Sequence, residues 1–246
     1  MSDTLYHWTN DSLATLPLKG GVRLRGMEMT RLETFTDAAF AFAVTLLVIS
    51  VDDVPNSYGE FVEALKKIPA FIMCFIQLML FWWGHHQWSR RYGLEDGWSM
   101  VWSLALVAMV LIYIYPLRAI LATYFAYVTG GALPMPFELD GSQIGALFVV
   151  FGVGFSSMAV LIVVLNLIAL RRRVSLAMNQ HEIRVTRGTA LGWGLVTVTG
   201  LISTFLAMVL PEDSKPLSGY VYFSLIVTFP LFRFWFGGRQ NVRVDA

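Results

Sequence analysis

Six runs of mostly apolar residues divide the sequence, and each is long enough to cross a lipid bilayer as a helix. The hydrocarbon core of a membrane requires about 20 such residues per helix. The expected spans are residues 33–51, 68–84, 98–124, 144–170, 191–210 and 220–236. The sequence therefore predicts an all-α integral membrane protein with six transmembrane helices.

Composition supports this class and excludes several others. Hydrophobic residues make up 56% of the chain and charged residues 14%, against about 25% charged residues in soluble domains. The net charge is only +1, and neither a basic stripe nor a nucleic-acid motif occurs. The single cysteine, Cys74, lies within an apolar run and reads as a small core residue. The polar first thirty residues do not have the pattern of a signal peptide.

The distribution of Lys and Arg predicts the orientation of the spans. Loops that carry an excess of these residues face the cytoplasm. The residues on the predicted inner side are Lys19, Arg23, Arg25, Arg31, Arg90, Arg91, Arg171, Arg172, Arg173, Arg184, Arg187, Arg239 and Arg243. The outer side has only Lys66, Lys67, Lys215 and Arg118, which we expect to reach the outer interface. Both termini are therefore predicted to be cytoplasmic, with an N-terminal arm (1–29), a six-helix domain (30–237) and a tail (238–246).

An acidic residue, Asp37, lies inside the inner part of the first span. An ionisable residue within a membrane segment is a functional hypothesis by default. The second and third spans place aromatic and polar residues at the same predicted level, namely Trp82, Trp83, His85, His86, Trp88, Trp98, Ser99 and Trp102. Their N–H groups can satisfy the carboxylate. We favour a network that holds three helices together, with direct ion or proton binding as the alternative.

Two local patterns refine this region. Thr30 and Glu33 have the spacing of a capping box at the start of the first helix. The adjacent His85 and His86 raise the question of a metal site, but neighbouring positions on a helix point about 100° apart. The sequence therefore predicts no bound metal or cofactor.

Larger apolar side chains and one hydroxyl share a face of the first helix. Ala38, Phe42, Thr45, Leu46 and Ile49 recur at spacings of three and four, while small residues (Ala39, Ala41 and Ala43) occupy the other faces. In a symmetric oligomer such a helix can line a pore, where apolar rings exclude water and gate it by dewetting. Packing of this face against a neighbouring helix is the equal alternative.

The residues around Asp37 resemble a family signature. Phe35-Thr36-Asp37 with Arg31 upstream is similar to the R-x-x-x-F-S-D motif of the transmembrane protein 175 family, the endosomal and lysosomal-type potassium channels. Leu65, Ile68, Pro69 and Phe71 at the start of the second span, and Trp83 and His86 at its end, also resemble that family, as do Pro116 and Tyr124 in the third span. The layout resembles the single-repeat prokaryotic form.

The resemblance implies a homotetramer in a prokaryotic cell membrane, with the first helix of each subunit lining a central pore that prefers K⁺. No T-V-G-Y-G filter occurs. When the family's constriction positions are aligned with this sequence from Asp37, they fall on Phe42, Leu46 and Ile49, and Thr45 supplies a hydroxyl beside them. Arg31, Phe35, Thr36, Asp37, Trp83 and His86 anchor the pore helix. Thr36 replaces the usual Ser, and Phe42 stands where a branched aliphatic residue is usual.

Other function classes fit the sequence less well. A secondary, proton-coupled transporter is the main alternative, but paired helix breaks in the two halves are absent. An enzyme is not expected, because no H-E-x-x-H, no G-x-S-x-G and no pair of intramembrane aspartates occurs. The expected partners are therefore permeant K⁺ ions, the bilayer and further copies of the chain, with no nucleic acid.

Overall fold

The computed structural model describes residues 8–49 and 55–237, apart from a few side chains near the ends of helices. Apart from one short β-hairpin, its regular structure is helical. The elements in chain order are α1 (Asn10–Thr15), β1 (Leu18–Lys19), β2 (Val22–Arg23), α2 (Arg31–Ile49), α3 (Tyr58–Lys66), α4 (Ile68–Tyr92), α5 (Gly97–Val128), α6 (Gly141–Arg171), α7 (Gln180–Val209), α8 (Leu217–Tyr220) and α9 (Ser224–Gly237), with 3₁₀ turns at Glu212–Ser214 and Val221–Phe223.

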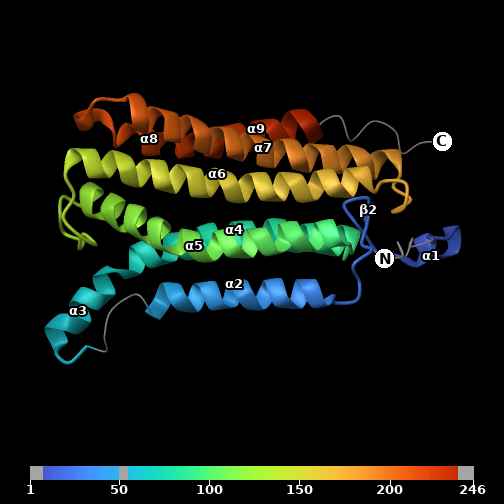
Figure 1. Cartoon of the computed structure of the whole chain (residues 1–246), viewed down its shortest axis with the longest axis horizontal. Coiled ribbons are helices and arrows are strands. Elements are labelled where there is room, and N and C mark those ends of the chain that lie inside the picture. The colour runs from blue at the N-terminus through green and yellow to red at the C-terminus, as the bar shows by residue number, and fades with distance from the viewer. Residues whose placement is uncertain (1–7, 50–54, 238–246) are drawn as a thin grey trace.

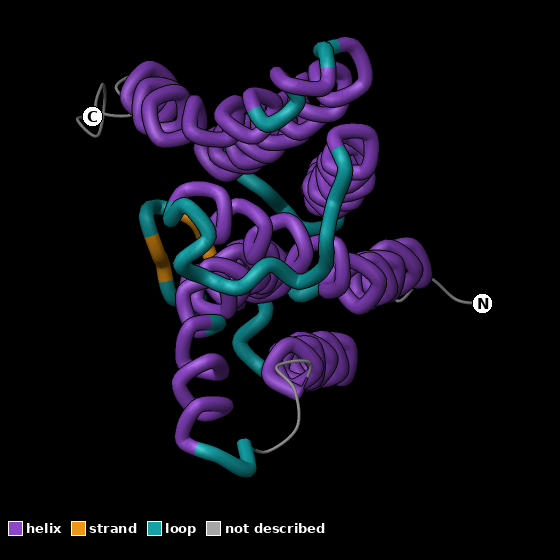
Figure 2. Tube along the Cα trace, turned by 90° about the vertical axis from the view of Figure 1, so that its left-hand side faces the viewer, coloured by secondary structure: helices purple, strands orange, loops and turns teal. Residues whose placement is uncertain are grey.

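The long helices lie side by side in a bundle. Figure 1 shows α2 along one edge, α4, α5 and α6 in the middle, and α7 to α9 along the other edge. The end-on view in Figure 2 shows the same arrangement, with α2 apart from α6 and α7. Helix α2 packs against α4 and α5. One side of α2 is therefore left without a neighbour from the described part of the chain.

Local sequence signals explain where the helices begin and end. Asp140 with Gln143, and Asn179 with Glu182, form capping boxes that start α6 and α7. Helix α4 ends at Tyr92 and is capped by Gly93, whose φ of 58° is a left-handed conformation that glycine adopts readily. The cap at Asn179 makes α7 begin at Gln180, well before the predicted start at residue 191.

Every predicted span contains a helix, but the six-span count is only partly supported. By length and composition, four segments of the described chain can cross a membrane, namely Tyr58–Tyr92, Gly97–Val128, Gln143–Arg171 and Gln180–Val209. Leu217–Phe232 is apolar but shorter, and α2 falls outside this set. The structure therefore shows an all-helical membrane-type bundle.

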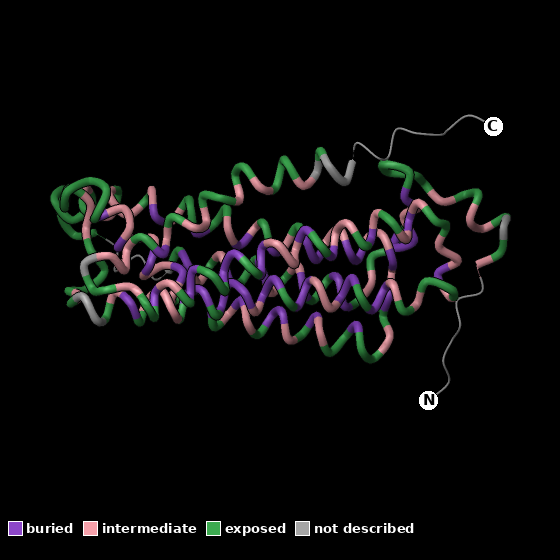
Figure 3. Tube along the Cα trace, turned by 90° about the horizontal axis from the view of Figure 1, so that it is seen from above, coloured by how far each residue is buried: buried purple, intermediate pink, exposed green. Residues whose placement is uncertain are grey.

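The core runs along the middle of the bundle, where the buried positions concentrate in Figure 3. Its largest cluster joins α2, α4, α5 and α6 through side chains such as Phe40, Leu78, Leu106 and Ile162. Helices α6 and α7 approach closely because glycines lie at their crossing. A Cβ atom on Gly152 would overlap the Thr204 hydroxyl, and one on Gly200 would overlap the Ser156 hydroxyl.

The N-terminal arm is fastened to the bundle by a buried ion pair. Both Arg25 and Glu182 have fully buried side chains, and two guanidinium N–H groups donate to the two carboxylate oxygens at 3.0 Å. The backbone N–H of Gly26 donates to the carbonyl of Arg90 at 3.1 Å. A Cβ atom on Gly26 would overlap the carbonyl oxygen of Ser89. The arm therefore lies directly against the end of α4 and the start of α7.

Candidate functional site

Helix α2 has one buried and one exposed face. Thr36, Phe40, Ala43 and Leu47 recur at spacings of three and four and are buried against the bundle. Phe35, Ala38, Phe42 and Thr45, together with Ala41 and Val48, are exposed in the single chain. Because α2 lies at the edge of the bundle (Figure 1), this exposed face is open to a bilayer or to another copy of the chain.

The predicted pore residues differ in how far they are exposed. Phe42 is 56% exposed. Thr45 is also exposed, and its hydroxyl donates to the carbonyl of Ala41 at 3.0 Å. Leu46 is half-buried and packs against the core. The side chain of Ile49 lies outside the described residues. Phe42 and Thr45 thus share the open face, with Leu46 at its border, and the gate assignment stays a prediction.

Asp37 is held by a tryptophan of α4. The indole Nε1–H of Trp82 donates to Oδ1 of Asp37 at 2.8 Å. One helical turn of α2 earlier, Glu33 is buried, with only 2% of its surface exposed. The Glu33 side chain does not complete the predicted capping box. Its backbone N–H donates to the Thr30 hydroxyl oxygen at 3.0 Å, while its carboxylate turns toward α4.

His86 connects these groups. Its ring stacks on that of Trp82, with centroids 5.0 Å apart and planes 19° apart. Its Nδ1 lies 3.5 Å from Oε1 of Glu33. Ligand atoms of Glu33, Asp37 and His86 all lie within 4.8 Å of one another. We name Glu33, Asp37, Trp82 and His86 the anchoring cluster, because they join α2 to α4.

The structure leaves the other predicted anchors outside this cluster. Arg31 and Phe35 are exposed, and Arg31 has no ion pair with the described residues. Trp83 is 46% exposed and lies beneath the ammonium group of Lys19, 5.7 Å from its ring centroid. Thr36 is buried, and its hydroxyl donates to the carbonyl of Leu32 at 2.8 Å, within α2.

Glu33 was absent from the predicted network, and Trp82 was predicted as a possible N–H donor to Asp37 but not among the anchors that the family resemblance implied. Helical spacing was the signal that could have singled out both residues. Glu33 lies four residues before Asp37, and Trp82 lies four residues before His86, so each pair shares a helix face. His85, in contrast, is fully buried on another face and contacts the Ser103 hydroxyl at 2.9 Å.

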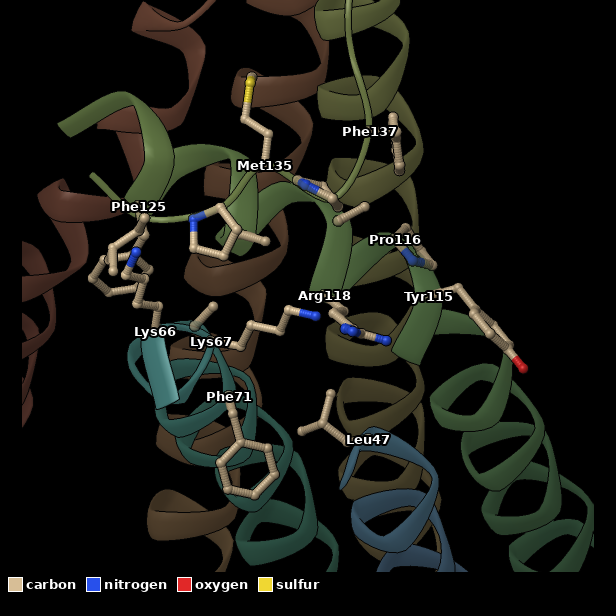
Figure 4. A pocket seen from close by; sticks show the side chains of 16 residues that line it. Leu47, Lys66, Lys67, Phe71, Tyr115, Pro116, Arg118, Phe125, Met135 and Phe137 are labelled. Carbon is tan, nitrogen blue, oxygen red and sulfur yellow. The ribbon is translucent and has the colours of Figure 1, made fainter. Parts of the chain in front are cut away.

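A cavity of about 650 Å³ lies at the other end of α4. Figure 4 shows Lys66 and Lys67, at the junction of α3 and α4, and Arg118 of α5 around this space, beside Pro116. Lys66 also pairs with Glu63 at 2.6 Å. Arg118, which the sequence places at the outer interface, thus lines a cationic cavity. Lys67 directly precedes α4 and lies about 28 Å along the helix axis from His86, so the cavity is separate from the anchoring cluster.

The helices that build this region match a known family. The model of the family described as endosomal/lysosomal potassium channel TMEM175 matches residues 31–116, from α2 into α5. This part of the chain is therefore similar to the TMEM175 family. A relative from Marivirga tractuosa, named potassium channel, is 28% identical over 210 residues, which are 81% of this chain and 84% of the relative.

Two solved TMEM175 structures share the fold. The T38A variant of the potassium channel MtTMEM175, in complex with a nanobody–MBP fusion protein, has a TM-score of 0.77 at 24% identity and covers 93% of this chain and 100% of its own. The lysosomal potassium-selective channel TMEM175 homologue from Chamaesiphon minutus has a TM-score of 0.53 at 22% identity, with 86% and 97% covered. The bundle of α2 to α9 is therefore a TMEM175 fold.

Proposed function

We propose that this chain forms a K⁺-preferring cation channel in the cell membrane, and that α2 lines its pore. The observation that carries this proposal is the open face of α2, which holds Phe42 and Thr45 at the edge of a TMEM175 bundle. A relative named potassium channel, similar over most of its length, supports the choice of ion.

In this proposal four copies surround a central axis, each presenting α2. Rings of Phe42, Leu46 and Ile49 form an apolar constriction that excludes water in the closed state. Thr45, whose hydroxyl is exposed, adds a ring of oxygen atoms beside the constriction. A hydroxyl oxygen that donates its proton to a backbone carbonyl keeps its lone pairs for a passing cation.

Reconstituted protein tests the channel assignment. We expect ohmic current in liposomes under opposing K⁺ and Na⁺ gradients, with a reversal potential near the equilibrium value for K⁺. A reversal potential near zero would show that the channel does not prefer K⁺ over Na⁺. Saturable flux driven by a pH gradient, without such current, would instead support the proton-coupled transporter.

Leu46→Asn tests the constriction. A polar side chain in a narrow apolar ring stabilises water there, so we expect a several-fold increase in basal K⁺ leak. Val198→Asn, at an exposed position of α7 on the other side of the bundle, is the matched control and should leave the leak unchanged. Equal leak in the two variants, both folded, would place the constriction elsewhere.

A further inference from the structure

We propose that Glu33, Asp37 and His86 form a binding site for a divalent transition-metal ion, which fastens α2 to α4. Two ligands come from one face of α2 and the third from α4. One ligand atom from each residue lies within 4.8 Å of the other two. This assignment differs from the prediction that the chain binds no ion other than permeant K⁺.

The spacing of these atoms suits a metal. Metal–ligand bonds of about 2.0–2.2 Å in tetrahedral geometry hold neighbouring ligand atoms about 3.4 Å apart. Oε1 of Glu33 and Nδ1 of His86 are already 3.5 Å apart. Asp37 needs only a small inward rotation, because its ligand atom lies within 4.8 Å of both.

Burial provides an independent observation. Glu33 is 2% exposed, and its Oε2 atom has no hydrogen-bond partner among the described residues. Nδ1 of His86 is likewise buried without a hydrogen bond within the described chain. A buried carboxylate oxygen without a hydrogen bond is costly, and a cation bound beside it removes that cost. Two carboxylates and a neutral imidazole match the charge of a divalent ion.

The ligand types indicate the class of metal. Imidazole nitrogen is a ligand for Zn²⁺ and related transition metals, whereas K⁺, Mg²⁺ and Ca²⁺ sites are built from oxygen atoms. Three protein ligands leave a fourth position for water. Zn²⁺ is therefore the probe of choice, and Co²⁺ its spectroscopic substitute.

Trp82 contacts two of the proposed metal ligands and holds them in position. Its indole N–H donates to Oδ1 of Asp37, which leaves Oδ2 for the metal, and its ring stacks on His86. Partners of this kind orient the ligands, and their loss weakens metal affinity about 10- to 100-fold. The cluster thus has both ligands and the groups that hold them in place.

Occupation of this site would restrain α2. Two residues of α2 and one of α4, linked by strong bonds to one ion, cannot separate while the ion is bound. If α2 lines the pore, as in the proposed function, Zn²⁺ should slow or prevent opening. This second step depends on the proposed function, whereas the binding site does not.

Calorimetric titration of purified, tag-free protein with Zn²⁺ tests the binding. We expect one tight site per chain, weakened more than about tenfold in Glu33→Gln and in His86→Gln and about tenfold in Trp82→Phe. The exposed Glu28 and the surface residue His181 provide matched controls, Glu28→Gln and His181→Gln, which should bind as the parent does. Co²⁺ should give visible absorption bands that both ligand variants lose.

The outcomes separate the two proposals. No tight site in the parent protein, or equal affinity in the ligand and control variants, would overturn the metal site, and Glu33 and His86 would then form an ion pair only. Zn²⁺ binding that is lost in the ligand variants establishes the site even if no current is recorded. If Zn²⁺ inhibits current in the parent protein, and at least ten times more Zn²⁺ is needed for the same inhibition in His86→Gln, the restraint on α2 is supported.

Discussion

At the scale of single residues, the region around Asp37 depends on one tryptophan. The hydrogen bond from Trp82 is the one that the structure gives to the Asp37 carboxylate within the described chain. Trp83 neighbours it in sequence but points to the surface, under Lys19. Two adjacent tryptophans therefore have different roles, which adjacent positions on a helix allow because they point about 100° apart.

Replacement of each tryptophan by phenylalanine tests this difference. Trp82→Phe removes the donor to a half-buried carboxylate, and the expected loss is about 1–3 kcal/mol of stability. Trp83→Phe, at an exposed position, should change stability little. Thermal unfolding in detergent with a chelator present measures both, and equal shifts in melting temperature would contradict the assignment of Trp82.

At the scale of helices, α6 and α7 form the closest packing in the bundle. Gly152 and Gly200 bring the two backbones together, and the hydroxyls of Ser156 and Thr204 fill the space beside them. Helices in a membrane associate through such close packing, because lipid provides no hydrophobic force between them. This pair is the support on which α5, α4 and finally α2 are layered (Figure 1).

Alanine substitution at two glycines of α7 tests the close crossing. In Gly200→Ala the new methyl group would overlap the Ser156 hydroxyl and lie 3.0 Å from Cδ1 of Phe155, so we expect a loss of about 1–3 kcal/mol. Gly194 has nothing within 4 Å of an added Cβ, and Gly194→Ala should be neutral or stabilise the helix by up to about 1 kcal/mol. Melting temperatures in detergent distinguish them, and similar values would contradict the crossing.

At the scale of the whole molecule, the position of α2 at the edge determines what an assembly can do. A helix in the middle of the bundle could not meet its copies at a common axis, whereas an edge helix with an open face can. A symmetric assembly around α2 would bring equivalent residues of neighbouring subunits close together.

Cysteine cross-linking tests this assembly. Cys74 is the only cysteine, so Cys74→Ala gives a background without thiols. In that background we expect Thr45→Cys to form disulfide-linked dimers rapidly under oxidation in membranes, because residues on a narrow central axis come within disulfide range. Val198→Cys, exposed on α7, should cross-link slowly. Faster cross-linking at residue 198 would place α7, not α2, between subunits.

The sequence by itself determined the class of this protein and most of its helices. Apolar runs of membrane length are visible without any tertiary information, because bilayer thickness fixes their length. The helix around residues 31–49 and the closeness of Asp37 to His86 also followed from the pattern. The predicted span at 191–210 left out the first turns of α7, because these turns are polar and the helix start is set by the capping box of Asn179 and Glu182.

Only the tertiary structure decided which side chains meet. The sequence placed several tryptophans and histidines at one level, but the rotation of α4 about its axis selected Trp82 and His86 and turned Trp83 outward. The same packing buried Glu33 beside His86. It also fastened Arg25 to Glu182, 157 residues away. Rotation about a helix axis and contacts between distant segments depend on the packing of all neighbours, and no local pattern of residues encodes them.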